Sequence, residues 1–160
     1  MIENEFGEIA IDGGFLQDAG VEITEMSQGC ICCSLVGDFG TALKEVVEKY
    51  HPARILIEPS GVGKLSDVIK AVQDVQEQNP ELVLNSYTTV VDAKKCKMYM
   101  RNFGEFFNNQ IEYATTVILS RSQNATPEQL EFCVKQIQEL NPKAAIVTTE
   151  WDKLSGEMLL

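Results

Sequence analysis

The sequence of residues 54–61 is Arg54-Ile55-Leu56-Ile57-Glu58-Pro59-Ser60-Gly61, a short apolar run that ends on a carboxylate, a proline and a glycine. An apolar run of this length, bounded by turn residues, predicts a buried strand at 54–57. Apolar residues recur at helical spacing on both sides, from Asp38 to Tyr50 and from Leu65 to Val75. A strand between two amphipathic helices is typical of βαβ units and of a parallel sheet.

The same alternation of strands and helices runs through the rest of the chain. His51-Pro52 and Asn79-Pro80 are predicted to end helices, and Thr126-Pro127 is predicted to start one with a cap. The further predicted strands are near residues 2–4, 21–25, 82–91, 115–119 and 144–147. We therefore expect an α/β fold in one domain, a mainly parallel sheet with helices on both faces.

The charge and composition of the chain exclude several classes of protein. It has 24 acidic and 13 basic residues and a formal net charge of −11, which repels phosphate backbones, so we expect no nucleic-acid partner. No apolar run approaches the roughly 20 residues of a membrane span, and we expect no membrane partner. The start, Met1 to Glu5, lacks the segments of a secretory signal, so the predicted compartment is the cytoplasm, where cysteines act as thiols or ligands.

Three of the five cysteines lie within Gly29-Cys30-Ile31-Cys32-Cys33. Thiolates are soft ligands that select Zn²⁺, Cu⁺ or similar ions. In an extended segment Cys30 and Cys32 point to one side and Cys33 to the other, so the backbone has to bend for all three to meet one ion, and Gly29 gives that freedom. No second Cys-X-X-Cys pair is present, so a fourth ligand comes from elsewhere or from solvent. An open position suits metal transfer better than storage.

Other interpretations of the cysteine motif stay open. The three thiols could be structural residues. Two of them, Cys32 with Cys33 or Cys30 with Cys32, could instead form a strained disulfide in a thiol redox module. A zinc-stabilised interaction domain without nucleotide activity is a third class of protein that would carry such a motif.

Five sequence blocks follow one another along nearly the whole chain. They are Glu3-Asn4-Glu5-Phe6-Gly7-Glu8 with Ile11-Asp12-Gly13, then Gly29-Cys30-Ile31-Cys32-Cys33, Ile57-Glu58-Pro59-Ser60-Gly61, Val90-Val91-Asp92-Ala93 and Leu140-Asn141-Pro142. In this order they resemble the CobW-like family of P-loop GTPases, which is similar to the GTPases that insert nickel into urease and hydrogenase. Members of the family are linked to cobalamin synthesis, zinc homeostasis and metal delivery. The resemblance implies a metallochaperone that couples nucleotide hydrolysis to metal transfer to a client metalloprotein.

The resemblance also implies roles for particular residues. It makes Cys30, Cys32 and Cys33 metal ligands, with Glu3 and Glu8 as candidate oxygen ligands. Zinc is favoured by ligand softness and abundance, and cobalt or nickel by the associations of the family.

For the nucleotide, the resemblance implies GTP with Mg²⁺. Glu58 is the expected catalytic and cofactor-binding residue, because it would hold the water shell of Mg²⁺. The Gly61 amide would sense the γ-phosphate. A surface turn without function is the other interpretation of this segment.

The chain departs from the family pattern at the phosphate loop. The family begins with a strand and a Gly-rich loop ending Gly-Lys-Ser/Thr, which cradles the phosphates. The segment Gly61-Val62-Gly63-Lys64-Leu65 lacks the first glycine and the final Ser or Thr, and is predicted to be a helix start. We expect residues 1–160 to be a truncated core domain without the phosphate loop and the C-terminal domain, and no hydrolysis by this piece alone.

A second departure concerns the base. The guanine-reading Asn-Lys-X-Asp of the family stands here as Ser120-Arg121-Ser122-Gln123. An aspartate accepts two hydrogen bonds from the guanine edge, whereas a glutamine amide offers one acceptor and one donor. We therefore expect the complete protein to bind GTP less selectively than its relatives do, or to tolerate ATP.

The remaining conspicuous residues are predicted to be structural. His51, the only histidine, is placed at a helix C-terminus, and Cys96 and Cys133 are placed in helices as small core residues. The apolar residues of 98–107 are expected to pack in a core. If they form an exposed patch, that patch would favour a homo-oligomer.

Overall fold

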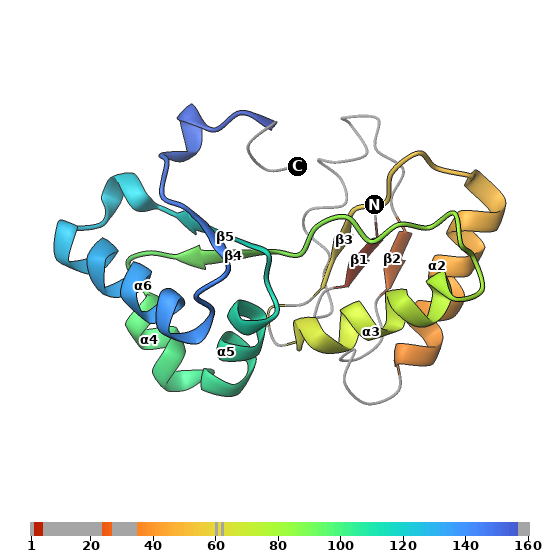
Figure 1. Ribbon diagram of the computed structural model, residues 1–160, viewed down its shortest axis with the longest axis horizontal. Coiled ribbons are helices and arrows are strands. Elements are labelled where there is room, and N and C mark those ends of the chain that lie inside the picture. Colours follow the sequence, from red (N-terminus) through yellow and green to blue (C-terminus); the bar gives the residue numbers. More distant parts are fainter. Residues whose placement is uncertain (1, 5–23, 27–34, 60, 62, 157–160) are drawn as a thin grey trace. The chain divides into compact units, whose positions relative to one another are not determined.

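The computed structural model describes residues 2–4, 24–26, 35–59, 61 and 63–156 (Figure 1). The chain divides into two compact units, Met1–Leu84 and Asn85–Leu160, and each unit is described by itself. Each contains a three-stranded sheet, and every pairing within the two sheets is parallel. The predicted α/β class with parallel strands is therefore confirmed.

The first unit has the strand order β2-β1-β3. Its described elements are β1 (Ile2–Asn4), β2 (Thr24–Met26), α2 (Leu35–Tyr50), β3 (Ile57–Glu58) and α3 (Leu65–Gln76). The helix α3 begins directly after Lys64, as predicted for the segment that imitates a phosphate loop.

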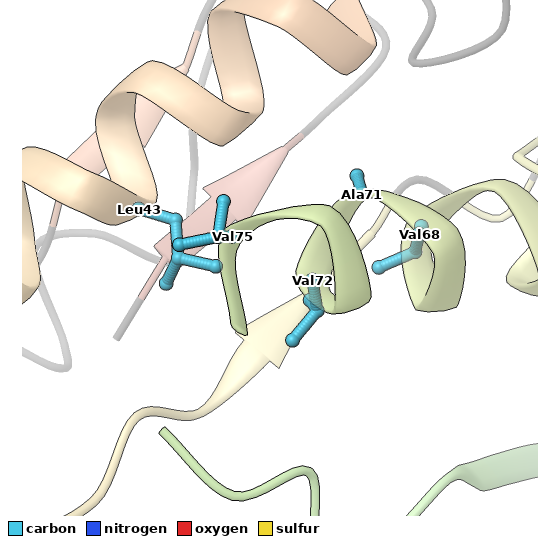
Figure 2. Close-up of a cluster of buried hydrophobic side chains, with 5 residues drawn as sticks. All are labelled: Leu43, Val68, Ala71, Val72 and Val75. Carbon is cyan, nitrogen blue, oxygen red and sulfur yellow. The ribbon is translucent and has the colours of Figure 1, made fainter. Parts of the chain in front are cut away.

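The core of the first unit lies between α2 and α3. Figure 2 shows Leu43 of α2 against Val75 of α3, with further small apolar residues along α3. The buried residues of this cluster are Leu43, Val68, Ala71, Val72 and Val75. The four residues of α3 recur at the three- and four-residue spacing that places side chains on one helix face, so Val68, Val72 and Val75 of the predicted stripe are confirmed as buried. Of the predicted stripe of α2, Leu43 is buried, and Val46 and Val47 are partly buried against the same cluster.

The strand β3 is shorter than the sequence suggests. A buried strand was expected at 54–57, but the structure has only Ile57–Glu58. Ile55 and Ile57 are half-buried against the core, whereas Leu56 is 62% exposed. The prediction of a fully buried strand was wrong, because the side chains alternate between core and solvent and only one side of this segment is covered.

His51 follows the last residue of α2 and has a left-handed backbone, with φ 45°. Its amide donates to the carbonyl of Val47 at 3.1 Å, which completes the last turn before Pro52. The predicted helix end is confirmed. A residue with a Cβ in this conformation costs about 1 kcal/mol relative to glycine.

We expect His51→Gly to raise the free energy of unfolding by about 0.5 kcal/mol. Glycine adopts the left-handed backbone conformation without steric cost, but it also increases the conformational entropy of the unfolded chain, which offsets part of the stabilisation. Urea denaturation measures the change. His51→Ala is the matched control, since it removes the imidazole and keeps the Cβ, and it should bring no gain. Equal stabilisation by both variants would contradict the backbone explanation.

The second unit has the strand order β4-β5-β6. Its strands and α-helices are β4 (Thr88–Asp92), α4 (Cys96–Asn102), α5 (Gly104–Glu112), β5 (Thr116–Ser120), α6 (Pro127–Leu140) and β6 (Ala145–Val147). Residues 85–156 also form two 3-10 helices, η1 (Ser122–Asn124) and η2 (Trp151–Lys153). The central strand β5 buries Val117, Ile118 and Leu119, so both of its faces are covered.

The predicted long strand at 82–91 is also shorter in the structure, where β4 starts only at Thr88. Leu82 and Leu84 pack instead against the core of the first unit, and Val83 is 73% exposed. The polar residues Asn85 and Ser86 interrupt the apolar sequence where the second unit begins, and the residues before them do not join the sheet of that unit.

The helix α6 starts as predicted. The Thr126 hydroxyl oxygen accepts from the Gln129 amide at 3.3 Å, and the Gln129 side chain accepts from the Thr126 amide at 2.9 Å. These two bonds form a capping box, with Pro127 as the first helical residue. The pKa of the Glu128 carboxyl is lowered. The larger cause is the hydrogen bond from the backbone amide of Glu128, and the second is the hydrogen bond from the Thr126 side chain.

Asn141 follows α6 and is buried. Its side-chain nitrogen donates to the carbonyl oxygens of Ile111 (2.9 Å), Glu112 (3.1 Å) and Ala114 (2.8 Å). Its side-chain oxygen accepts from the amides of Lys143 and Ala144, each at 3.2 Å. One side chain thus joins the end of α5, the approach to β5 and the turn before β6.

The apolar residues of 98–107 differ from the expectation of core packing. Phe107 is buried, as expected, but Met98 and Phe103 are about half exposed, at 45% and 47%. The expectation was wrong for these two residues, because α4 is short and buries only Cys96, and the buried residues of α5 are Phe107 and Ile111.

Candidate functional site

Three glutamates occupy equivalent positions across the sheet of the first unit. Figure 1 shows β1 between β2 and β3. Glu3 of β1 is the register partner of Glu25 in β2 and of Glu58 in β3. The strands are parallel, so the segments that follow them all leave from one edge of the sheet. In open α/β sheets this carboxyl edge is where ligands bind.

Of the predicted metal ligands, Glu3 lies in β1, and the others follow β1 and β2 in the sequence. Glu8 follows β1 by four positions, and the motif with Cys30, Cys32 and Cys33 follows β2. Since β1 and β2 are hydrogen-bonded neighbours, the two segments start side by side. Glu8 and the three cysteines lie outside the described residues, so their convergence on one ion stays a prediction.

Glu58 and Gly61 are the predicted nucleotide residues, and both are described. Glu58 is the last residue of β3, and its side chain is exposed. A Cβ built on Gly61 would meet no atom within 4 Å, so the space beside this residue is open. An accessible carboxylate oxygen is a ligand that Mg²⁺ accepts, usually with water completing the shell. The residues present therefore fit the predicted role.

In the second unit, Asp92 organises the carboxyl ends of β4 and β5. One of its carboxylate oxygens accepts from the amides of Lys94 (2.9 Å) and Lys95 (3.2 Å). The other lies 3.1 Å from Nη1 of Arg121. The Ala93 amide also donates to the Ser120 carbonyl, so two strand ends are joined at this edge.

The segment Ser120–Gln123 takes its shape from this connection. Arg121 has a left-handed backbone, with φ 57°, and its guanidinium is held by Asp92. Ser122 is buried, whereas Arg121 and Gln123 are exposed. The side chain at the position predicted to read the base, Gln123, is therefore available to a ligand.

The role of Asp92 as the partner of Arg121 was not found from the sequence. Asp92 was noted only as part of the block Val90-Val91-Asp92-Ala93, without a role. The signal that could have found it is the pairing of β4 with β5, which places Asp92 opposite Ser120. This pairing links residues that are far apart in sequence.

The described residues contain neither a metal-binding cluster nor a membrane-spanning helix. Among the side chains that the structure describes, no group of three or more His, Cys, Asp or Glu residues could hold a metal ion, so the predicted metal site depends on the cysteine segment. No helix of the described part is long and apolar enough to cross a membrane.

Comparison with known proteins gives a consistent result. The family model for the CobW/HypB/UreG nucleotide-binding domain matches residues 1–148. The chain is 26% identical over 159 residues to the zinc chaperone YeiR of Escherichia coli (strain K12), covering 99% of this chain and 48% of YeiR. It is 25% identical over 153 residues to the zinc chaperone YjiA of the same strain, covering 92% of this chain and 47% of YjiA.

A eukaryotic relative is also similar along most of the chain. The zinc-regulated GTPase metalloprotein activator 1 of Schizosaccharomyces pombe is 22% identical over 161 residues, covering 96% of this chain and 39% of the relative. The chain thus spans about half or less of the length of these relatives. No solved structure matches it.

Proposed function

Because the chain belongs to the CobW/HypB/UreG nucleotide-binding domain family, we propose that it is the nucleotide-hydrolase core of a metallochaperone, which delivers a thiophilic divalent metal to a client metalloprotein. The names of its relatives, zinc chaperones and a zinc-regulated GTPase, support zinc as the metal. The single observation that carries the proposal is the family match over residues 1–148.

For the metal, we propose Cys30, Cys32 and Cys33 as the ligands, with Glu3 or Glu8 supplying oxygen. The parallel pairing of β1 and β2 supports this set, because it starts the acidic segment and the cysteine segment from adjacent strand ends. Three thiolates prefer zinc over hard cations such as Mg²⁺, and cobalt and nickel remain chemically compatible with the set.

For the nucleotide, we propose that the Glu58 carboxylate orients the water molecules of the Mg²⁺ shell and that the Gly61 backbone faces the terminal phosphate. Bound Mg²⁺ would supply neutralisation of phosphate charge. The exposed carboxylate of Glu58 and the open space at Gly61 support these roles. The activity of the whole protein, its client and a cytoplasmic location are parts of the same proposal.

The test of the metal proposal is a zinc titration of the reduced protein with a competing chelator. We expect one zinc per chain and about tenfold weaker binding in Cys32→Ser, because a hydroxyl is a poorer zinc ligand than a thiolate. Cys133→Ala is the matched control. It removes a thiol outside the motif and should leave the zinc stoichiometry unchanged.

Two outcomes of this titration would count against the proposal. Absence of stoichiometric zinc, together with ready disulfide formation within the motif, would favour a thiol redox module. Stoichiometric zinc in a full-length protein that binds no nucleotide would favour a zinc-stabilised interaction module.

A further inference from the structure

The segment that is predicted to read the base is joined to the end of β4 by two hydrogen bonds and an ion pair. The Ser120 carbonyl oxygen accepts from the Ala93 amide at 3.1 Å, and the Ser120 hydroxyl donates to the Val91 carbonyl at 3.4 Å. In the ion pair, Nη1 of Arg121 lies 3.1 Å from Oδ2 of Asp92. The segment therefore starts from a fixed position at the carboxyl edge of this sheet.

The Asp92 carboxylate is itself held in one orientation. Its Oδ1 atom accepts from the backbone amides of Lys94 (2.9 Å) and Lys95 (3.2 Å), and its side chain is only 12% exposed. These bonds fix the direction of the other oxygen, Oδ2, which contacts Arg121. An ion pair loses less side-chain entropy when one partner is already fixed, so Asp92 is a suitable anchor for a longer and more mobile side chain.

The backbone after Ser120 has a conformation that needs support. Arg121 has a φ of 57°, which is sterically unfavourable for a residue with a Cβ. Its carbonyl accepts from the Asn124 amide at 3.0 Å, and the Ser122 carbonyl accepts from the Ala125 amide at 3.2 Å. A backbone conformation with an intrinsic cost persists when surrounding contacts favour it. The ion pair with Asp92 is such a contact, because it holds the side chain of the residue in question.

The side chains that follow Arg121 give η1 little further polar support. Ser122 is buried, but within the part of the chain that the structure describes its hydroxyl oxygen has no hydrogen-bond partner. Gln123 and Asn124 are exposed. The position of the Gln123 side chain therefore depends on the backbone of η1, and this backbone depends on the orientation of Arg121.

We propose that Asp92 is a positioning residue for the base of a purine nucleotide. It acts through Arg121, whose guanidinium it holds, and it thereby keeps residues 120–123 in the conformation that presents the Gln123 amide to the base. The role rests on the proposed nucleotide function, because it assigns Asp92 to the support of that site. Asp92 is not itself a contact of the base in this proposal.

The variant that tests this role is Asp92→Asn in the full-length protein. The side-chain oxygen of asparagine can still accept from the Lys94 and Lys95 amides, so the turn before α4 keeps its hydrogen bonds. The negative charge that pairs with Arg121 is lost. Arg121→Lys is the matched control, since it keeps a positive charge opposite Asp92.

Amide hydrogen exchange without nucleotide measures the positioning directly. In Asp92→Asn we expect the Asn124 and Ala125 amides to exchange about three- to fivefold faster, because the loss of a partly exposed ion pair shifts a local opening equilibrium by a factor of this order. The Gln129 amide, which is bonded within the capping box, should keep its rate. Equal rates at Asn124 and Ala125 in variant and wild type would overturn the positioning role.

Nucleotide titrations measure the consequence for the base. Asp92→Asn should weaken binding of GTP and of ATP by about three- to fivefold, because only molecules with an ordered segment bind the base. Binding of inorganic tripolyphosphate with Mg²⁺, which has no base, should stay unchanged. Arg121→Gln should cause the same loss, and the double variant should lose no more than either single variant, because Asp92 acts through Arg121. Arg121→Lys should stay within about twofold of wild type.

The outcomes separate this role from the proposed nucleotide function. If wild type binds the nucleotides and Asp92→Asn binds them equally well, the positioning role is overturned and the nucleotide function stands. The same conclusion follows if tripolyphosphate binding weakens as much as GTP binding, or if the losses in the double variant multiply. A wild-type protein that binds tripolyphosphate but neither nucleotide would refute the nucleotide function, and the role of Asp92 with it.

Discussion

Replacing Asn141 by alanine is expected to lower the free energy of unfolding by about 3 kcal/mol or more. The change removes the side-chain donor to three carbonyl oxygens and the acceptor for two amides. The Ile111 carbonyl keeps the Ala114 amide at 3.2 Å, but each hydrogen bond lost contributes about 1 kcal/mol, and a buried carbonyl left without a partner costs about 1 to 3 kcal/mol. Because a domain is stable by only about 5 to 15 kcal/mol, this is a large share. Urea denaturation, followed by circular dichroism, measures the loss.

Two further variants separate the roles of the Asn141 side chain. Asn141→Asp keeps the oxygen that accepts from Lys143 and Ala144 but loses the donors, so it should be at least as unstable as the alanine variant. Asn124→Ala is the control at an exposed asparagine of the same unit and should change stability by less than about 0.5 kcal/mol. If Asn141→Asp were as stable as wild type, the stability would depend only on the hydrogen bonds that the side-chain oxygen accepts in the turn before β6.

Replacing Gln123 by aspartate in the full-length protein is expected to raise the preference for GTP over ATP by about tenfold to hundredfold. The expectation depends on the proposed nucleotide function. A carboxylate accepts both hydrogen bonds from the guanine edge, and a matched polar contact in a base site is worth about 1 to 3 kcal/mol. The amide of Gln123 can instead accept from the amino group of adenine and donate to its ring nitrogen. Parallel titrations of wild type and variant with GTP and ATP measure the ratio.

The control for Gln123→Asp is Asn124→Asp, which adds the same charge one position along the same 3-10 helix. It should leave the ratio of GTP to ATP affinity unchanged, because the difference is attributed to hydrogen-bond matching and not to charge. A wild-type protein that already prefers GTP strongly would refute the idea that Gln123 relaxes base selectivity. Binding of neither nucleotide would instead count against the nucleotide function itself.

Local signals in the sequence predicted much of the fold. The cap at Thr126 with Pro127, the end of α2 at His51 and the buried stripe of α3 all depend on neighbours within four or five positions. Such patterns act through helix geometry alone. The structure confirms them with small shifts at the ends.

The features that the sequence did not predict depend on partners far along the chain. In the sequence, Leu82 and Leu84 resemble the start of a strand, but in the structure they pack against the core of the first unit. The ion pair of Asp92 with Arg121 joins residues separated by about 30 positions. The order of the sequence motifs along the chain and the parallel pairing of β1 with β2 support the predicted metal ligands. The arrangement of these ligands around an ion stays a prediction.

The capping box of α6 has a consequence for amide hydrogen exchange. First-turn amides usually exchange quickly with solvent because they lack partners, but those of Thr126 and Gln129 are bonded to side chains. Fraying at this helix start should therefore be suppressed. The 3-10 helix η1, which contains Gln123, ends two residues before Thr126 and is therefore joined to a well-ordered helix start. Binding of a ligand to Gln123 should then cost little conformational entropy in this segment.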